Sequence, residues 1–140
     1  HVDGTSYDGA LLGGYLLEEN SSKPDIVLVA SGAEVPLAVK TAAELKKKHS
    51  VNVVSVPSIE VFERQTNAYK NKIISKDAKL VVAIEASNDT KWLKILGEKG
   101  VVFGVESYQC SGNGEEILNK AGFNVKNLAK FVESKLKAQK

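Results

Sequence analysis

The chain has 140 residues, of which 43% are hydrophobic, and a formal net charge of +2 at pH 7. This length and apolar content fit one compact domain with one core, which needs no metal or disulfide in order to fold. The low net charge argues against a nucleic-acid-binding protein, and no apolar run approaches the roughly 20 residues that span a bilayer.

The start of the sequence and its single cysteine indicate what kind of chain this is and in which compartment it occurs. The sequence begins at His1 and contains no methionine, so we expect a piece of a longer protein. Residues 1–14 are rich in Gly and Asp and are expected to lead in from a preceding domain, with residues 1–140 forming one domain. Cys110 cannot form an internal disulfide and is compatible with a reducing cytosol, which favours a cytoplasmic location.

Short apolar runs predict the strands of the sheet. Tyr15–Leu17 predicts an additional strand at an edge, antiparallel to its neighbour. Four later runs are apolar nearly throughout, which is typical of parallel strands buried on both faces: Ile26–Ala30, Val51–Val56, Leu80–Ile84 and Val101–Val105. With helices between them and right-handed crossovers, they predict an α/β fold, a three-layer, open, doubly wound sheet that is mostly parallel.

The first predicted helix follows the strand Ile26–Ala30. Its apolar residues recur at helical spacing, at Val35, Ala38, Val39, Ala42 and Leu45. Ser31 and Glu34 have the spacing of a capping box. Pro36 has no amide hydrogen to donate, so the regular helix is expected to begin one or two residues after the position that a Ser31 cap alone would give.

Three further helices are predicted downstream. One lies around Trp92–Leu96, and a short one covers Glu115–Lys120 and ends at Gly122. The last helix is predicted to have Asn127 as its N-cap. Its buried residues are expected to be Leu128, Phe131, Val132 and Leu136.

The Ser31–Gly32 turn is the first candidate site, because open α/β sheets bind ligands beyond the carboxyl ends of their strands. Gly32 could let an anion approach the amides at the following helix start. The turn lacks the glycine-rich dinucleotide fingerprint and a P-loop lysine, so a simple helix cap is favoured over an anion site.

Other strand ends carry weaker candidates. Glu85 and Glu106 could form an acid–base pair, but structural roles are favoured for both. The Ser111–Gly114 turn, with Gly112 and Gly114, resembles a phosphate loop only in composition, and its favoured role is to lead into the helix at Glu115.

The sequence offers little material for catalysis. Cys110 has no histidine near it in sequence, which argues against a cysteine nucleophile, and His49 follows a run of lysines that is expected to be solvated. No metal-ligand spacing is present, and Trp92 is expected to be a core or interface anchor. We therefore predict no catalytic, cofactor-binding or metal-binding residue in this chain.

Several segments, in order, resemble the C-terminal domain of transketolases. The resemblance covers essentially all 140 residues and rests on the order and spacing of motifs that are weak one by one. They are Asp3–Tyr7 leading to Gly13–Tyr15, Ser31–Val35 with Leu37–Val39, Val53–Ser58 with Phe62–Gln65, Val82–Ala86 with Trp92, and Gly122–Phe123 with Val125. The sequence departs from the family at Lys91, Glu106, Gln109 and Cys110, all in loops at strand ends, and these departures leave the fold prediction unchanged.

The resemblance implies an activity for a longer parent enzyme. Transketolases transfer a two-carbon ketol unit from a ketose phosphate to an aldose phosphate, using thiamine diphosphate as the electron sink and a divalent cation, usually magnesium. In the family, the groups that bind the cofactor, the metal and the sugar phosphate lie on other domains, and none of those motifs occurs here, so no catalytic residue carries over. The resemblance implies that this domain packs against the middle domain and a partner subunit, supporting a homodimer.

Two alternatives stay open. The chain could be the equivalent domain of a related thiamine-diphosphate enzyme, such as dihydroxyacetone synthase, deoxyxylulose-phosphate synthase or an E1 β subunit. It could also be a stand-alone module that binds a small anion at the Ser31 or Gly112 turn. The sequence preceding His1 would separate the first alternative from transketolase, and calorimetric titration would test the second.

Overall fold

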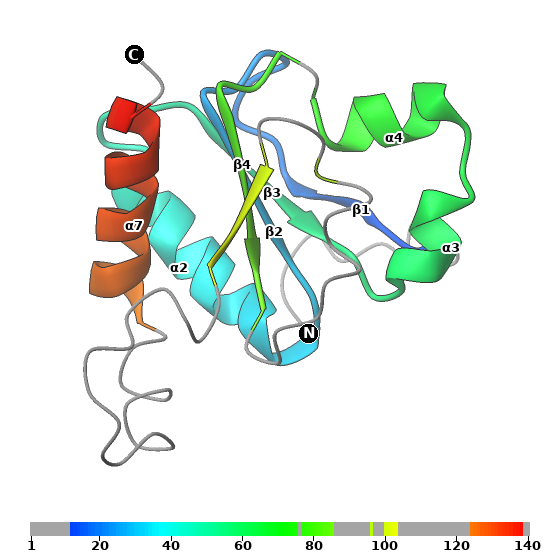
Figure 1. Ribbon diagram of the computed structural model, residues 1–140, viewed down its shortest axis with the longest axis horizontal. Coiled ribbons are helices and arrows are strands. Elements are labelled where there is room, and N and C mark those ends of the chain that lie inside the picture. The colour runs from blue at the N-terminus through cyan, green and yellow to red at the C-terminus, as the bar shows by residue number, and fades with distance from the viewer. Residues whose placement is uncertain (1–11, 76, 86–95, 97–99, 104–123, 139–140) are drawn as a thin grey trace.

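The computed structural model describes residues 12–75, 77–85, 96, 100–103 and 124–138, and it contains a five-stranded sheet with helices on both faces (Figure 1). The strand order is β1-β3-β2-β4-β5. The strands are β1 (Tyr15–Glu18), β2 (Ile26–Ala30), β3 (Val51–Ser55), β4 (Leu80–Ile84) and β5 (Gly100–Phe103). β1 runs antiparallel to β3, and every other pairing is parallel. This confirms the α/β fold with an antiparallel edge strand.

One face of the sheet is covered by the long helices α2 (Val35–Leu45) and α7 (Val125–Ala138). Their apolar sides meet the side chains on that face of the strands. The core between them includes Ile26, Leu28, Val53, Leu80, Leu128 and Val132. Phe103 adds a tilted ring contact with Phe131, with ring centroids 5.1 Å apart.

The other face is covered by two short helices, α3 (Ile59–Glu63) and α4 (Asn67–Ile73). Their core contains Val27, Val29, Val54, Phe62, Ile73 and Leu96. Successive strand residues point to opposite faces, so a strand that is apolar at every position fills both cores. The predicted three-layer arrangement is therefore observed.

The helix after β2 starts later than a Ser31 cap would place it. A single 3₁₀ turn covers Gly32–Glu34, and the regular helix begins at Val35 with Pro36 in its first turn, where a missing amide hydrogen costs no hydrogen bond. The capping box was wrong, because the Ser31 side chain makes no capping hydrogen bond. Of the apolar residues predicted at helical spacing, Val39 is only half-buried. Thr41, a polar residue, is buried on the inner side of α2.

The cap of the last helix was also misplaced. The side-chain oxygen of Asn124 accepts a hydrogen bond of 2.8 Å from the backbone amide of Asn127, so Asn124 occupies the capping position and Asn127 lies inside α7. Leu128 and Val132 are buried as predicted, whereas Phe131 and Leu136 are half-buried. The predicted helices around Trp92–Leu96 and Glu115–Lys120 fall outside the described residues, except that Leu96 is helical and buried.

Candidate functional site

The carboxyl end of the sheet carries the Ser31–Gly32 turn. Ser31 is extended, with φ −136° and ψ 143°, and its carbonyl accepts a 3.2 Å hydrogen bond from the Glu34 amide. Gly32 has a φ of +56°, in the left-handed region that favours glycine, and a Cβ atom there would have no heavy atom within 4 Å. The glycine is therefore needed for the backbone conformation and not for close packing.

Two carboxylates lie close to this turn. Burial, together with the nearby charge of Glu85, raises the pKa of Glu34, although a hydrogen bond from its own backbone amide opposes the shift. Glu34 and Glu85 thus bring like charges to the end of β2 and β4, where an anion would have to bind. The sequence analysis considered Glu85 as one half of an acid–base pair with Glu106. Glu106 lies outside the described residues.

Three further features of the sequence analysis concern residues 92–114. Cys110, the Ser111–Gly114 turn and Trp92 all lie outside the described residues. Within the described part of the chain, no group of three or more His, Cys, Asp or Glu side chains could hold a metal ion.

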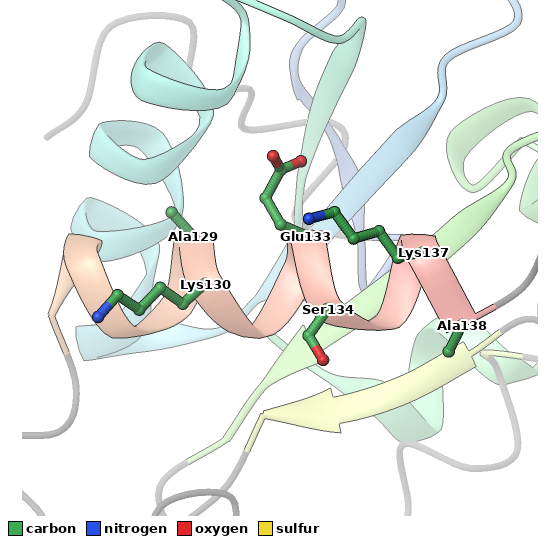
Figure 2. Close-up of a pocket in the computed structure, with 6 residues that line it drawn as sticks. All are labelled: Ala129, Lys130, Glu133, Ser134, Lys137 and Ala138. Carbon is green, nitrogen blue, oxygen red and sulfur yellow. The ribbon is translucent and has the colours of Figure 1, made fainter.

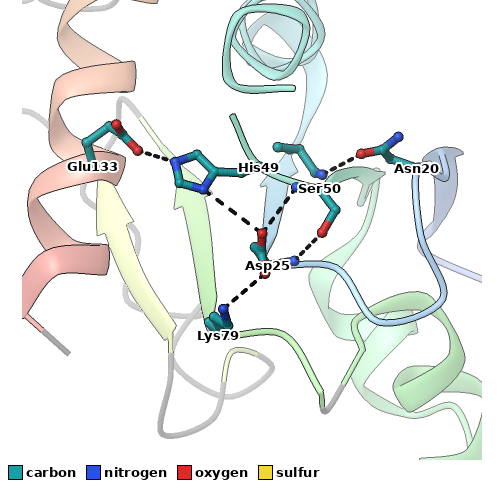
Figure 3. A network of polar contacts seen from close by, with 7 residues as sticks. Asn20, Asp25, His49, Ser50, Lys79 and Glu133 are labelled. Carbon is teal, nitrogen blue, oxygen red and sulfur yellow. Dashed lines mark hydrogen bonds and ion pairs between the residues drawn. The ribbon is translucent and has the colours of Figure 1, made fainter. Parts of the chain in front are cut away.

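A polar cluster lies at the opposite, amino end of the sheet (Figure 3). Asp25, just before β2, has its Oδ1 3.3 Å from the ammonium of Lys79, and its Oδ2 accepts a hydrogen bond of 3.3 Å from the Ser50 amide. The Ser50 hydroxyl in turn accepts from the Asp25 amide at 2.8 Å. Partial burial acts to raise the pKa of Asp25, but the Ser50 amide and the Lys79 charge outweigh it and leave that pKa below its usual value.

His49 joins this cluster to the last helix. Its Nε2 lies 2.5 Å from Oε1 of Glu133 on α7, and its Nδ1 lies 4.0 Å from Oδ2 of Asp25. Sequence reasoning had singled out His49 only as a histidine after a lysine run, and it missed Asp25 and Glu133. The available signal was that Asp25 and Ser50 immediately precede two neighbouring parallel strands, whose amino ends meet at one edge.

The exposed side of α7 borders an open hollow of about 670 Å³ (Figure 2). Its described lining residues are Ala129, Lys130, Glu133, Ser134, Lys137 and Ala138. They all lie on a single helix and combine small side chains with two lysines and Glu133. No convergent set of polar groups of the kind that orients a ligand is present among them.

The segment that precedes β1 is packed against α3 and α4. Gly13 has a φ of +86°, its carbonyl accepts a 3.2 Å hydrogen bond from the Ser58 amide, and a Cβ atom on it would lie 2.3 Å from the Phe62 amide nitrogen. A Cβ atom on Gly14 would lie 2.7 Å from the Phe62 ring. The Tyr69 hydroxyl donates a hydrogen bond of 2.6 Å to the Gly14 carbonyl. A side chain at either glycine would therefore clash with Phe62. We call the Gly13–Gly14 pair, at the start of the domain, the joint.

Comparisons with known proteins agree with this architecture. A family model described as the transketolase-like C-terminal domain matches residues 13–124. A probable transketolase of Streptococcus pneumoniae is 38% identical over 133 residues, which are 94% of this chain and 20% of that protein. A chloroplastic transketolase of Spinacia oleracea is 36% identical over 137 residues, which are 96% of this chain and 18% of that protein.

Solved structures give the same result. A transketolase from Leishmania mexicana matches with a TM-score of 0.78 and 28% identity, over 97% of this chain and 20% of that chain. The chain spans about a fifth of the length of the relatives that it matches. From its sequence and its fold, the chain belongs to the transketolase family, in which it corresponds to the C-terminal domain.

Proposed function

We propose that this chain is the non-catalytic, structural domain of a transketolase, an enzyme that transfers a two-carbon ketol unit from a ketose phosphate to an aldose phosphate. The observation that carries the proposal is that residues 13–124 match the family's C-terminal domain while the chain spans only about a fifth of its relatives. The chemistry then belongs to the remaining four fifths of the parent enzyme. Since one fold can host many functions, the role of this chain depends on which chemical groups its surface carries.

The described residues do not fit thiamine diphosphate and its magnesium ion. A divalent cation needs several oxygen ligands, and no group of three or more His, Cys, Asp or Glu residues is placed to supply them in the described ranges. A diphosphate near the Ser31–Gly32 turn would face the negative charges of Glu34 and Glu85. We therefore assign the cofactor, the metal and the sugar-phosphate substrates to other domains of the parent.

The joint at Gly13–Gly14 supports a structural role. Because Phe62 and the Tyr69 hydroxyl hold these two glycines, the path of the backbone into β1 is fixed. Leu12, beside the joint, is a large apolar residue with 37% of its surface exposed. We propose that the domain packs on the preceding domain of the parent near this joint and helps to hold a homodimer.

Deletion from the parent enzyme tests this role. The segment that corresponds to residues 15–140 is removed, and dimerisation is measured by sedimentation and ketol transfer by steady-state kinetics. We expect loss of the dimer together with loss of turnover. A truncated parent that dimerises and turns over substrate like the intact enzyme would reject the structural role.

Transketolase is preferred over dihydroxyacetone synthase, deoxyxylulose-phosphate synthase and an E1 β subunit, because the relatives described above are transketolases. The stand-alone anion-binding module is disfavoured by the two carboxylates beside the Ser31–Gly32 turn. We propose a cytoplasmic location, although the Spinacia oleracea relative is chloroplastic. Among the described residues, no helix combines the length and the apolar content that a membrane span requires.

A further inference from the structure

His49 lies between two carboxylates that come from distant parts of the chain (Figure 3). It follows α2 and precedes β3, and only 20% of its side chain is exposed. Glu133 faces its Nε2 at 2.5 Å, and Asp25 faces its Nδ1 at 4.0 Å. The imidazole thus connects the middle of α7 to the turn before β2.

The surroundings of His49 contain charges of both signs. Asp25 is paired with Lys79, which precedes β4. Between the end of α2 and α7 lies a hollow of about 170 Å³, and its lining residues are Glu44, Leu45, Lys47, Lys48, His49, Ala129 and Glu133. Lys47 pairs with Glu44 at 3.1 Å, and Lys137 lies one turn beyond Glu133 on α7 (Figure 2).

The number of protons on His49 decides how many of these contacts it can make. A neutral imidazole carries one N–H group, so when Nε2 donates to Glu133, the lone pair of Nδ1 faces the Asp25 carboxylate. A protonated imidazole carries N–H groups on both nitrogens and a positive charge between two negative ones. Protonation therefore strengthens both contacts at once.

We propose that His49 is a pH-sensitive latch, whose protonation fastens the C-terminal helix α7 to the amino end of the sheet. The latch acts on a helix in which Leu128 and Val132 are fully buried, while Phe131 and Leu136 are half-buried against the same core. Asp25 stays ionised when His49 gains its proton, because the Ser50 amide and Lys79 hold the pKa of Asp25 below its usual value despite partial burial. Protonated His49 then holds α7 more tightly than neutral His49 does.

Hydrogen exchange of the 140-residue chain tests the latch. Protection factors of the α7 amides, corrected for intrinsic exchange, are measured at about pH 6 and about pH 8. We expect protection of α7 to be about two- to fivefold higher at the lower pH, the range of a partly exposed ion pair. In His49→Gln, which cannot be protonated, the ratio of the two protection factors should fall to one.

Two further variants keep the test decisive. Glu133→Gln removes the partner on α7 and should also abolish the pH dependence, even if His49→Gln does not fold. Glu44→Gln breaks the exposed Glu44–Lys47 pair in the same region and should leave the pH dependence unchanged. Equal protection of α7 at both pH values in the wild-type chain, or a pH dependence that survives in Glu133→Gln, would overturn the proposal.

Discussion

The hydroxyl of Tyr69 donates a hydrogen bond of 2.6 Å to the carbonyl oxygen of Gly14, across 55 residues of sequence. The Tyr69 ring also packs edge-on against Phe62, with ring centroids 6.2 Å apart. Burial raises the pKa of the Tyr69 hydroxyl, so the group stays protonated and able to donate. Together the two aromatic side chains fix the path of the chain into β1.

Gly13→Ala should destabilise the domain by about 3 kcal/mol or more, because the new Cβ atom meets backbone atoms of Phe62 and the residue keeps a positive φ. Urea unfolding measures the change. Gly32→Ala is the matched control, since Gly32 also has a positive φ but has open space around it. It should cost only about 1–2 kcal/mol. Equal losses in the two variants would contradict the close packing of the joint.

Thr41→Val should stabilise the domain by about 1 kcal/mol. The Thr41 side chain is fully buried in α2, and its hydroxyl has no hydrogen-bond partner among the described residues. Thr66→Val, the same chemical change on α4, is the control. The Thr66 hydroxyl accepts from the Tyr69 amide as an N-cap, so its removal should destabilise by about 1 kcal/mol. Thermal melts that show a loss in both variants would refute the buried, unpaired state of Thr41.

Glu34→Gln should stabilise the domain near neutral pH by less than about 1 kcal/mol, because Glu34 is partly solvated. The pKa of Glu34 is raised in the folded state by burial and by Glu85, so its ionised form costs stability above that pKa. The cost disappears as the pH falls below the value of the unfolded chain. The variant should therefore match the wild type at about pH 3 and exceed it at about pH 7. A gain of the same size at both pH values would contradict the electrostatic origin.

Asn52→Ala should destabilise the domain by about 2–4 kcal/mol. Asn52 is only 3% exposed in β3, where its side-chain oxygen accepts from the amides of Asn20 and Ser21 and its side-chain amide donates to the Ser21 carbonyl. Asn67→Ala, on the exposed surface of α4, should change the free energy of unfolding by less than about 0.5 kcal/mol. An Asn52 variant as stable as the Asn67 variant would show that these three bonds do not hold the β1–β2 turn.

The strands could be predicted because most of their positions are apolar. β2 and β4 match their predicted bounds, and β3 ends one residue earlier than predicted, at Ser55. The short helices α3 and α4 were not predicted, since five and seven residues are too few for a clear helical period. Their N-caps, Ser58 and Thr66, were the available signals.

The polar contacts could not be predicted in the same way. The pairing of His49 with Glu133 spans 84 residues and depends on how α7 lies across α2. The helix cap at Asn124 was missed because Asn127 is an equally good capping residue, and only the backbone path distinguishes them. The spacing of Ser31 and Glu34 predicts a capping box, whereas the charge that acts on Glu34 is that of Glu85, at the end of β4.

In the proposed function, the chain contributes structure and not chemistry to a transketolase. This division of roles is tested by isothermal titration of the purified 140-residue chain with thiamine diphosphate and magnesium. A ketol-transfer assay with a ketose phosphate and an aldose phosphate follows. We expect a folded protein that shows neither saturable binding heat nor turnover. Stoichiometric thiamine diphosphate binding, or measurable ketol transfer by the chain alone, would contradict the claim.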